Sequence, residues 1–300
     1  MITNRKVKKL TGGKAAIDGA GVHLVRVLGH GDTTDYDPFL MLDAFDSRNP
    51  DDYTKGFPWH PHRGIETITY LIRGDIEHGD SLGNRGSIKD GDCQWMTAGS
   101  GIIHQEMPQA CERMLGAQLW LNLPAKDKMT EPAYGDITAE KVPVLDEDGA
   151  QIRVVAGSYR GHQGAFSGKY VPATYLDVEL AEGKEWCLET NPHNTVFLYA
   201  FTGEAVVTDG SGTKLPAEPK DEDLPDVNAE AGEEIIEARQ AVLFTLGDRL
   251  CLRAIEPIRF ILLSAPPLRE PIAWGGPIVM NTRAELERAF RELDDGTFIR

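Results

Sequence analysis

Two histidine-containing sequence motifs organise this chain. Residues 56–64 read GFPWHPHRG, and residues 94–108 read QWMTAGSGIIHQEMP. Because side chains alternate between the two faces of an extended strand, His60 and His62 share one face of a first strand. For the same reason, His104 and Glu106 share one face of a second strand. Two short strands therefore offer four donor groups that can meet at one point.

The donor groups indicate the kind of ion. Neutral imidazoles and a carboxylate suit Fe, Mn, Co, Ni, Cu or Zn, whereas Ca or Mg would need more oxygen ligands. Four protein ligands would leave coordination positions open for chemistry. A lone His-x-His pair more often binds nothing, so the second pair after the glycine-rich turn at 99–101 decides the prediction. An HxH strand, then hairpins, then a strand with a third histidine is the arrangement of a cupin barrel.

Both motifs, together with DPFLMLD at 37–43 and PIVMNT at 277–282, closely resemble the pirin family over nearly the whole chain. The resemblance implies an all-β protein: two antiparallel cupin (jelly-roll) β-barrels in tandem, with a C-terminal helix packed back on them. It implies one divalent transition metal per chain, with Fe(II) expected and Mn, Co, Ni, Cu or Zn as alternatives. The ligands that it implies are His60, His62, His104 and Glu106.

Glu66 is an alternative carboxylate ligand. In cupins generally the carboxylate follows the HxH pair by four residues, which is the position of Glu66 here. Glu66 is expected to share the strand face of His60 and His62, so geometry alone allows either carboxylate. The resemblance to pirins favours Glu106, and Glu66 is then expected to support a ligand or to replace one.

Three other histidines are expected to be structural. His78 lies 16 residues beyond His62, on another strand. His23 and His30 lie in or beside a short alternating strand and are expected at the surface or at a strand end.

Composition excludes several classes of function. The 47 acidic and 31 basic residues leave a formal charge of −16, which repels nucleic-acid phosphates, so no direct nucleic-acid binding is expected. The four cysteines lack CxxC spacing and are expected to be free thiols in a reducing compartment. No apolar run is long enough for a signal peptide or a membrane span. A monomeric cytoplasmic protein without membrane contact is expected.

Three hundred residues are enough for two barrels. We expect the metal-binding barrel at 1–145, and a second barrel with the terminal helix at 146–300. An internal repeat places Glu189 and Asn191 opposite the first histidine pair. It places Leu252 and Ala254 opposite the second ligand pair. The second barrel is therefore expected to lack a metal site.

Two further segments have a clear composition. Residues 214–234 read KLPAEPKDEDLPDVNAEAGEE, which predicts a solvated acidic insertion. Thr282 and Glu285 have capping-box spacing, and Gly296 is placed to end a helix. The apolar stripe of this helix consists of Leu286, Ala289, Phe290 and Leu293.

The resemblance also implies an activity. It suggests a metal-dependent oxidoreductase like quercetin 2,3-dioxygenase, which cleaves the central ring of a flavonol with O2. Glu106, or Glu66, would accept the proton of the 3-hydroxyl group. The alternative is a non-enzymatic, Fe-dependent, redox-sensing protein, like a transcription co-regulator, that acts through a protein partner near Arg63. The expected walls of the substrate pocket are Phe45, Phe57, Trp59, Glu66, Trp95 and Met96.

Overall fold

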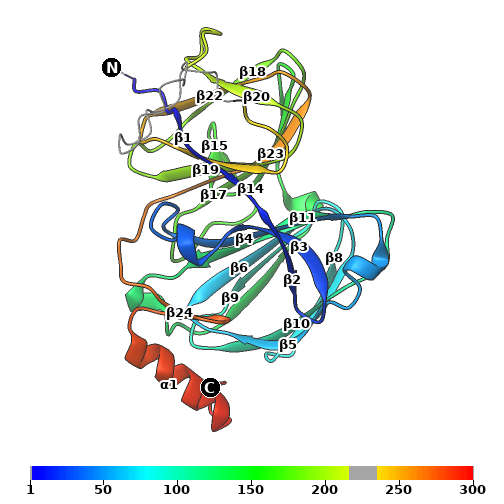
Figure 1. Cartoon of the computed structure of the whole chain (residues 1–300), viewed down its shortest axis with the longest axis vertical. Helices are drawn as coiled ribbons and strands as arrows, with labels where there is room; N and C mark the ends of the chain where they lie inside the picture. Colours follow the sequence, from blue (N-terminus) through cyan, green and yellow to red (C-terminus); the bar gives the residue numbers. More distant parts are fainter. Residues whose placement is uncertain (1, 216–234, 300) are drawn as a thin grey trace, which may run out of the picture. The chain divides into compact units, whose positions relative to one another are not determined.

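The computed structural model describes residues 2–215 and 235–299, and most of its regular structure is β-strand (Figure 1). Within the described strands every pairing is antiparallel. The predicted all-β class is confirmed. Contacts divide the chain into a first unit of residues 14–141, 169–171 and 268–300, and a second unit of 1–13, 142–168 and 172–267.

The first unit contains two main sheets. The larger has the order β12-β9-β6-β11-β4-β3-β2, and the smaller has the order β5-β10-β7-β8. The larger sheet is built from β2 (Lys14–Asp18), β3 (Val22–Leu28), β4 (Phe39–Ser47), β6 (Ile65–Arg73), β9 (Cys93–Thr97), β11 (Met114–Asn122) and β12 (Ala133–Ile137). The smaller is built from β5 (Phe57–His62), β7 (Ile76–Asp80), β8 (Arg85–Ile88) and β10 (Ile102–Pro108).

Residue types explain the strands that position the site. β6 is rich in β-branched residues and is buried along almost its whole length, as expected of a central strand. In β10 the burial alternates residue by residue, so one face points into the barrel. His104 and Glu106 lie on that inner face. Figure 1 shows β10 beside β5.

The chain changes sheet between β5 and β6. β5 ends at His62 in the smaller sheet, and β6 begins at Ile65 in the larger one. Gly64 makes the crossing with a φ of +78°, and a Cβ atom there would lie 1.9 Å from the carbonyl oxygen of Val279. Only glycine fits. Glu66 therefore does not continue the strand of the histidine pair, and the expectation that it shares their strand face was wrong.

The second unit also contains two main sheets, of orders β1-β21-β19-β23-β17-β14-β13 and β18-β22-β20. Leu252 and Ala254, which the repeat aligns with the ligand positions, are buried in a large apolar core. The strands of this unit are β1 (Val7–Gly12), β13 (Val144–Glu147), β14 (Ala150–Ala156), β15 (Ser158–Tyr159), β16 (His162–Gln163), β17 (Thr174–Leu180), β18 (Glu185–Glu189), β19 (Thr195–Thr202), β20 (Ala205–Thr208), β21 (Gln240–Phe244), β22 (Arg249–Ala254) and β23 (Ile258–Ala265).

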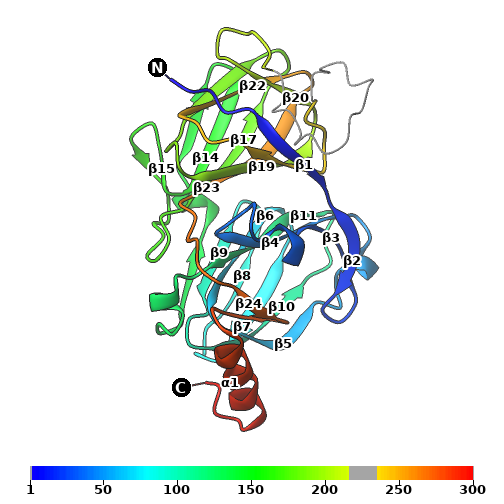
Figure 2. The same ribbon diagram turned by 60° about the vertical axis from the view of Figure 1, so that its left-hand side comes forward.

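The two ends of the chain are assigned differently from the expected division at residue 145. β1 pairs with β21, so residues 1–13 belong to the second unit. The C-terminal segment, residues 268–300, belongs to the first unit and carries β24 (Ala273–Gly275), β25 (Ile278–Met280) and α1 (Arg283–Asp294). In Figure 2, α1 lies next to β24. The physical reason is burial, because Val279 packs into a core cluster of the first unit.

The predicted helix and its capping box are confirmed in α1, but Phe290 of the predicted apolar stripe is exposed. The Thr282 hydroxyl accepts a hydrogen bond from the Glu285 backbone N–H at 3.2 Å, and the Glu285 carboxylate accepts one from the Thr282 N–H at 2.9 Å. Ala289 is fully buried on the apolar face. Gly296 follows the helix with a φ of +69°. No helix of the described residues is long and apolar enough to cross a membrane.

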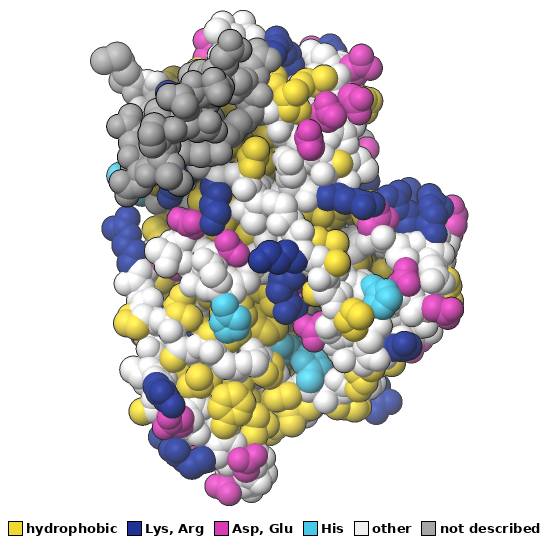
Figure 3. Space-filling view, viewed as in Figure 1, with side chains coloured by type: hydrophobic (Ala, Val, Ile, Leu, Met, Phe, Trp, Pro, Cys, Tyr) yellow, Lys and Arg dark blue, Asp and Glu magenta, His cyan; other side chains and the backbone are white. Residues whose placement is uncertain are grey.

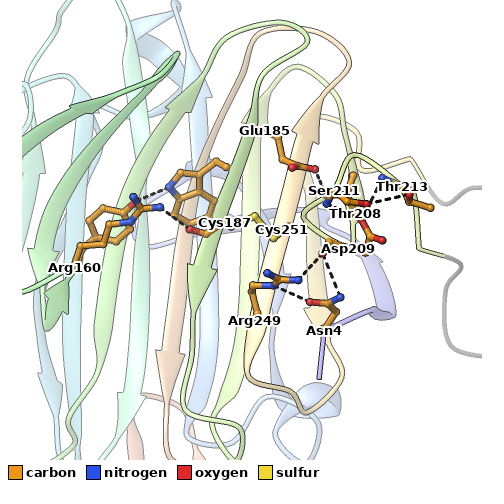
Figure 4. Close-up of a disulfide and its surroundings, with 12 residues drawn as sticks. Asn4, Arg160, Glu185, Cys187, Thr208, Asp209, Ser211, Thr213, Arg249 and Cys251 are labelled. Atoms are coloured by element: carbon orange, nitrogen blue, oxygen red, sulfur yellow. Dashed lines mark hydrogen bonds between the residues drawn. A yellow bond between two sulfur atoms is a disulfide. The ribbon is translucent and has the colours of Figure 1, made fainter. Parts of the chain in front are cut away.

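One pair of cysteines forms a disulfide, contrary to expectation. Cys187 on β18 and Cys251 on β22 lie directly opposite each other and form a disulfide (Figure 4). The expectation of four free thiols was therefore wrong for this pair, because strand pairing brings together residues 64 positions apart. Cys93 and Cys111 are free. Most of the expected acidic insertion, residues 216–234, lies outside the described residues.

Candidate metal centre

Three histidines converge inside the first unit. β5 and β10 pair so that His104 lies opposite His60, and His62 follows two residues along β5. Their ligand nitrogens all lie within 4.8 Å of one another. The ring centroids are 4.4 Å apart for His60 and His104, and 5.0 Å apart for His62 and His104. Over residues 2–215 and 235–299, no other group of three His, Cys, Asp or Glu side chains converges in this way.

Backbone carbonyls orient two of the rings. His60 Nδ1 lies 2.8 Å from the Pro58 carbonyl oxygen, and His62 Nδ1 lies 3.2 Å from that of Pro277. With the proton on Nδ1, each ring donates to its carbonyl and leaves the Nε2 lone pair for a metal. The Nε2 atom of His104 is buried without a hydrogen-bond partner. Such a buried orphan costs about 1–3 kcal/mol, and a metal ion would satisfy it.

The electrostatics keep two of these rings neutral. Burial lowers the pKa of His62 well below its usual value, and the neighbouring histidines lower it further. Burial likewise lowers the pKa of His104, with a further contribution from His60. At neutral pH both rings are therefore uncharged, which is the form that binds a metal.

Glu106 is buried beside the cluster but is held by other side chains. It is 3% exposed, and Thr69 donates a hydrogen bond to its Oε1 at 2.9 Å. The Gln118 amide nitrogen donates to Oε1 at 2.9 Å and to Oε2 at 2.8 Å. The β5–β10 register shifts after His104, so Glu106 lies opposite Phe57. The structure thus brings Glu106 to the same barrel interior without including it in the three-histidine cluster.

Glu66 lies on β6 and is completely buried. Its Oε1 accepts a hydrogen bond from the Thr97 hydroxyl at 2.7 Å, and the Trp95 side chain also interacts with the carboxylate. Burial raises the pKa of this carboxyl. Glu66 is therefore a buried acid outside the histidine cluster.

A cavity of about 490 Å³ opens beside the histidines. Trp120 forms one wall, and its ring lies 5.1 Å from that of His62 and 5.7 Å from that of Trp274. His30 stacks on Trp274 with centroids 3.8 Å apart. Figure 3 shows histidine side chains among apolar and basic ones on one face of the molecule. The other lining residues are Asp18, Gly19, Arg26, Gly29, Met41, Asp43, Phe57, Pro58, His60, Gln118, Gly276 and Pro277.

The cavity also has a charged wall. The Arg26 guanidinium donates hydrogen bonds to both oxygens of Asp43, at 2.9 and 2.7 Å. It also donates to Asp18 at 2.6 Å. The Arg26 charge is thus balanced by two carboxylates, and hydrogen bonding to Asp43 raises the pKa of Arg26. No motif in the sequence had indicated this wall.

The predicted pocket residues are found in different places. Phe57 lines the cavity, but the other five are absent from its lining. Trp59 points outward and is 51% exposed, since it alternates with His60. Trp95 and Met96 are buried in β9, and Glu66 is buried in β6. Phe45 packs against a separate core cluster. His30 is exposed, as expected, and it also lines the cavity.

Two buried cations hold the turn that follows His62. The Arg63 guanidinium donates to the Glu292 carboxylate at 2.7 Å and to the Phe298 carbonyl at 3.0 Å. The Lys128 ammonium donates to the Gly64 and Val279 carbonyls, at 2.9 and 3.0 Å. Burial lowers the pKa of Lys128 to about 7. Both cations therefore tie the metal-site strand to the C-terminal segment.

Comparison with known proteins identifies the family. A family model described as Pirin matches residues 21–121, and one described as the pirin C-terminal cupin domain matches residues 175–299. A Pseudomonas aeruginosa protein named "Putative quercetin 2,3-dioxygenase" is 42% identical over 302 residues, covering 99% of each chain. The chain belongs to the pirin family. The predicted family and the predicted cupin fold are confirmed.

Solved structures resemble this pirin-family chain over most of its length. The crystal structure of a quercetin 2,3-dioxygenase from Acinetobacter baumannii matches with a TM-score of 0.83 and 31% identity, covering 98% of each chain. The Escherichia coli pirin YhhW, solved in complex with nickel(II), matches with a TM-score of 0.63 and 16% identity, covering 86% of this chain and 99% of that one. The latter likeness shows a shared fold.

Within this pirin fold, the three-histidine cluster suits a transition-metal ion. Its donors are imidazole nitrogens. Backbone carbonyls orient the rings of His60 and His62, and the buried Nε2 atom of His104 has no hydrogen-bond partner. Imidazole donors of this kind bind Fe, Cu, Ni and Zn among others, so the donor set fits a metal without naming it.

Proposed function

We propose that this protein is a metal-dependent dioxygenase of the quercetinase type, which cleaves the central ring of a flavonol with O2. One observation carries the proposal: the orphaned Nε2 of buried His104 meets His60 and His62 beside a cavity with aromatic walls. The names of the Pseudomonas and Acinetobacter relatives support the same activity.

The proposed metal is one divalent ion per chain, with Fe(II) expected and Mn, Co, Ni, Cu or Zn as alternatives. His60, His62 and His104 would hold it through their Nε2 atoms, and Glu106 is proposed as the fourth ligand. When bound, the ion would supply Lewis-acid polarisation of the substrate's 3-hydroxyl group.

The other residues would bind and orient the substrate. Trp120 and Trp274 offer aromatic rings against which a planar flavonol can stack, and Phe57 adds a further apolar wall. Glu106 would accept the proton of the 3-hydroxyl group. Glu66 remains the alternative base, because burial raises its pKa and a base must have a pKa towards neutrality to work at pH 7.

Oxygen uptake with quercetin tests the proposal. Protein loaded in turn with Fe, Mn, Co, Ni or Cu should consume O2 with at least one metal, and His104→Ala should abolish uptake. His193→Ala, which changes an exposed histidine of the second unit, is the matched control and should keep the wild-type rate. A zero rate with every metal would reject the enzyme and favour the redox-sensing regulatory protein.

A further inference from the structure

Gln118 is the residue that joins Glu106 to the cavity. It lies in the middle of β11, opposite Thr69 of β6 and Asp43 of β4. Its side chain is partly buried and lines the cavity together with His60 and His62. No motif in the sequence singles it out.

The chemistry of its neighbours dictates the orientation of the Gln118 amide. An ionised carboxylate can only accept hydrogen bonds, and an indole N–H can only donate one. The amide nitrogen therefore faces Glu106, donating at 2.9 and 2.8 Å to its two oxygens. The amide oxygen faces the Trp120 Nε1–H at 3.4 Å. Gln118 thus links a wall of the cavity to the buried carboxylate.

Thr69 completes this arrangement. Its hydroxyl accepts a hydrogen bond from the Gln118 amide at 3.0 Å and donates one to Glu106 Oε1 at 2.9 Å. Every hydrogen bond that the structure gives to the Glu106 carboxylate thus comes from Gln118 or Thr69, within the described residues. With Glu106 only 3% exposed, water cannot replace them.

We infer that Gln118 is a positioning residue, which sets the direction of the Glu106 carboxylate and thereby the strength and geometry of metal binding. The inference rests on the proposed function, in which Glu106 is the fourth ligand. Glu106 Oε1 accepts two of the hydrogen bonds from Gln118 and Thr69 and Oε2 accepts one, so Oε2 keeps a lone pair for a metal ion. A ligand held in this way loses less freedom when it coordinates a metal, and losing such support typically costs about 10–100-fold in metal affinity.

The test is Co2+ binding by the full chain. Gln118→Met keeps the length of the side chain and removes its hydrogen bonds. Affinity is measured by competition with a chelator, and coordination by the visible absorption of Co2+. We expect about 10–100-fold weaker binding than wild type and a changed Co2+ spectrum. Thr69→Val removes one hydroxyl donor. It should change the Co2+ affinity and the Co2+ spectrum in the same direction as Gln118→Met, but by a smaller amount.

Gln94→Met is the matched control. Gln94 is another buried glutamine of the same barrel, but it is absent from the cavity lining, and its amide donates to Tyr134 at 3.4 Å. The Co2+ affinity and the Co2+ spectrum of Gln94→Met should equal those of wild type. Thermal unfolding of the metal-free variants checks that all of them fold.

The outcomes separate this inference from the proposed function. Wild-type affinity and spectrum in both Gln118→Met and Thr69→Val would overturn the role of Gln118 and leave the metal site intact. A wild-type chain that binds no Co2+ would overturn the metal site, and the inference with it. Tight wild-type binding without quercetin turnover would overturn the proposed activity, whereas weaker binding by Gln118→Met would still support the role of Gln118.

Discussion

His62 Nδ1 lies 3.2 Å from the carbonyl oxygen of Pro277, a residue 215 positions further along the chain. A histidine of the candidate metal centre is therefore oriented by the C-terminal segment. Arg63, the next residue, binds the same segment through Glu292. The metal site and the C-terminal segment should consequently respond together when either is disturbed.

Arg63→Met tests this dependence. The Arg63 side chain is 2% exposed and that of Glu292 is 15% exposed. The variant removes the buried partner of a carboxylate that also pairs with Arg288, and it leaves the Ser100 and Phe298 carbonyls without this donor. We expect a loss of about 3–5 kcal/mol in the free energy of unfolding, together with weaker Co2+ binding. Arg283→Met is the control, since its pair with Glu287 is at the surface and should contribute about 0–1 kcal/mol. Equal losses in urea unfolding of the two variants would contradict the prediction.

Each imidazole should be essential for the metal. His60→Ala, His62→Ala and His104→Ala should yield largely metal-free protein by elemental analysis, because three nitrogens are the core of the donor set. The free energy of unfolding without metal should change far less than in a zinc finger, since each unit has its own apolar core. Retention of a full equivalent of metal by any of the three variants would place the site elsewhere.

The two carboxylates should differ in their effect on turnover. Glu106→Gln keeps the shape but removes the proposed base, and should lower the rate of O2 uptake by about 10²–10⁴-fold. Glu66→Gln, if Glu66 only supports the site, should lower it by about 10–100-fold at most. Oxygen uptake at matched metal content measures both. The reverse order would assign the base to Glu66.

Lys128 should make stability depend on pH. Burial lowers its pKa in the folded protein from 10.5 to about 7, so between these values the unfolded chain binds more protons. The cost of burying the charge is fully present below about pH 7 and disappears as the pH rises towards 10. The free energy of unfolding should therefore rise more steeply from pH 7 to pH 9 in wild type than in Lys128→Met. Parallel urea-derived curves would show that Lys128 titrates normally.

The disulfide predicts a labelling pattern. Without reductant, alkylation of the unfolded chain should add two labels, on Cys93 and Cys111, and with reductant it should add four. Reduction should lower the free energy of unfolding by about 2–5 kcal/mol. Cys93→Ser is unsuitable as a control because Cys93 is buried, so Cys111→Ser serves instead. Four labels without reductant, read by intact mass, would show that the bond does not form in solution.

Local patterns determined much of what was predicted from sequence. The two-residue period of a strand places His60 and His62 on one face, and the resemblance to pirins adds His104 of the second motif to them. The capping box of Thr282 and Glu285 and the turn at Gly296 are likewise properties of a few consecutive residues. Such patterns are readable because neighbours along the chain create them.

Only the tertiary structure decided which distant residues complete the site. Glu66 follows the histidine pair in sequence, yet the crossing at Gly64 puts it in another sheet. His30 and Trp274 meet at one cavity wall, and Gln118 reaches Glu106. The physical reason is that strand pairing and burial join residues far apart along the chain, and no local period encodes which strands will pair.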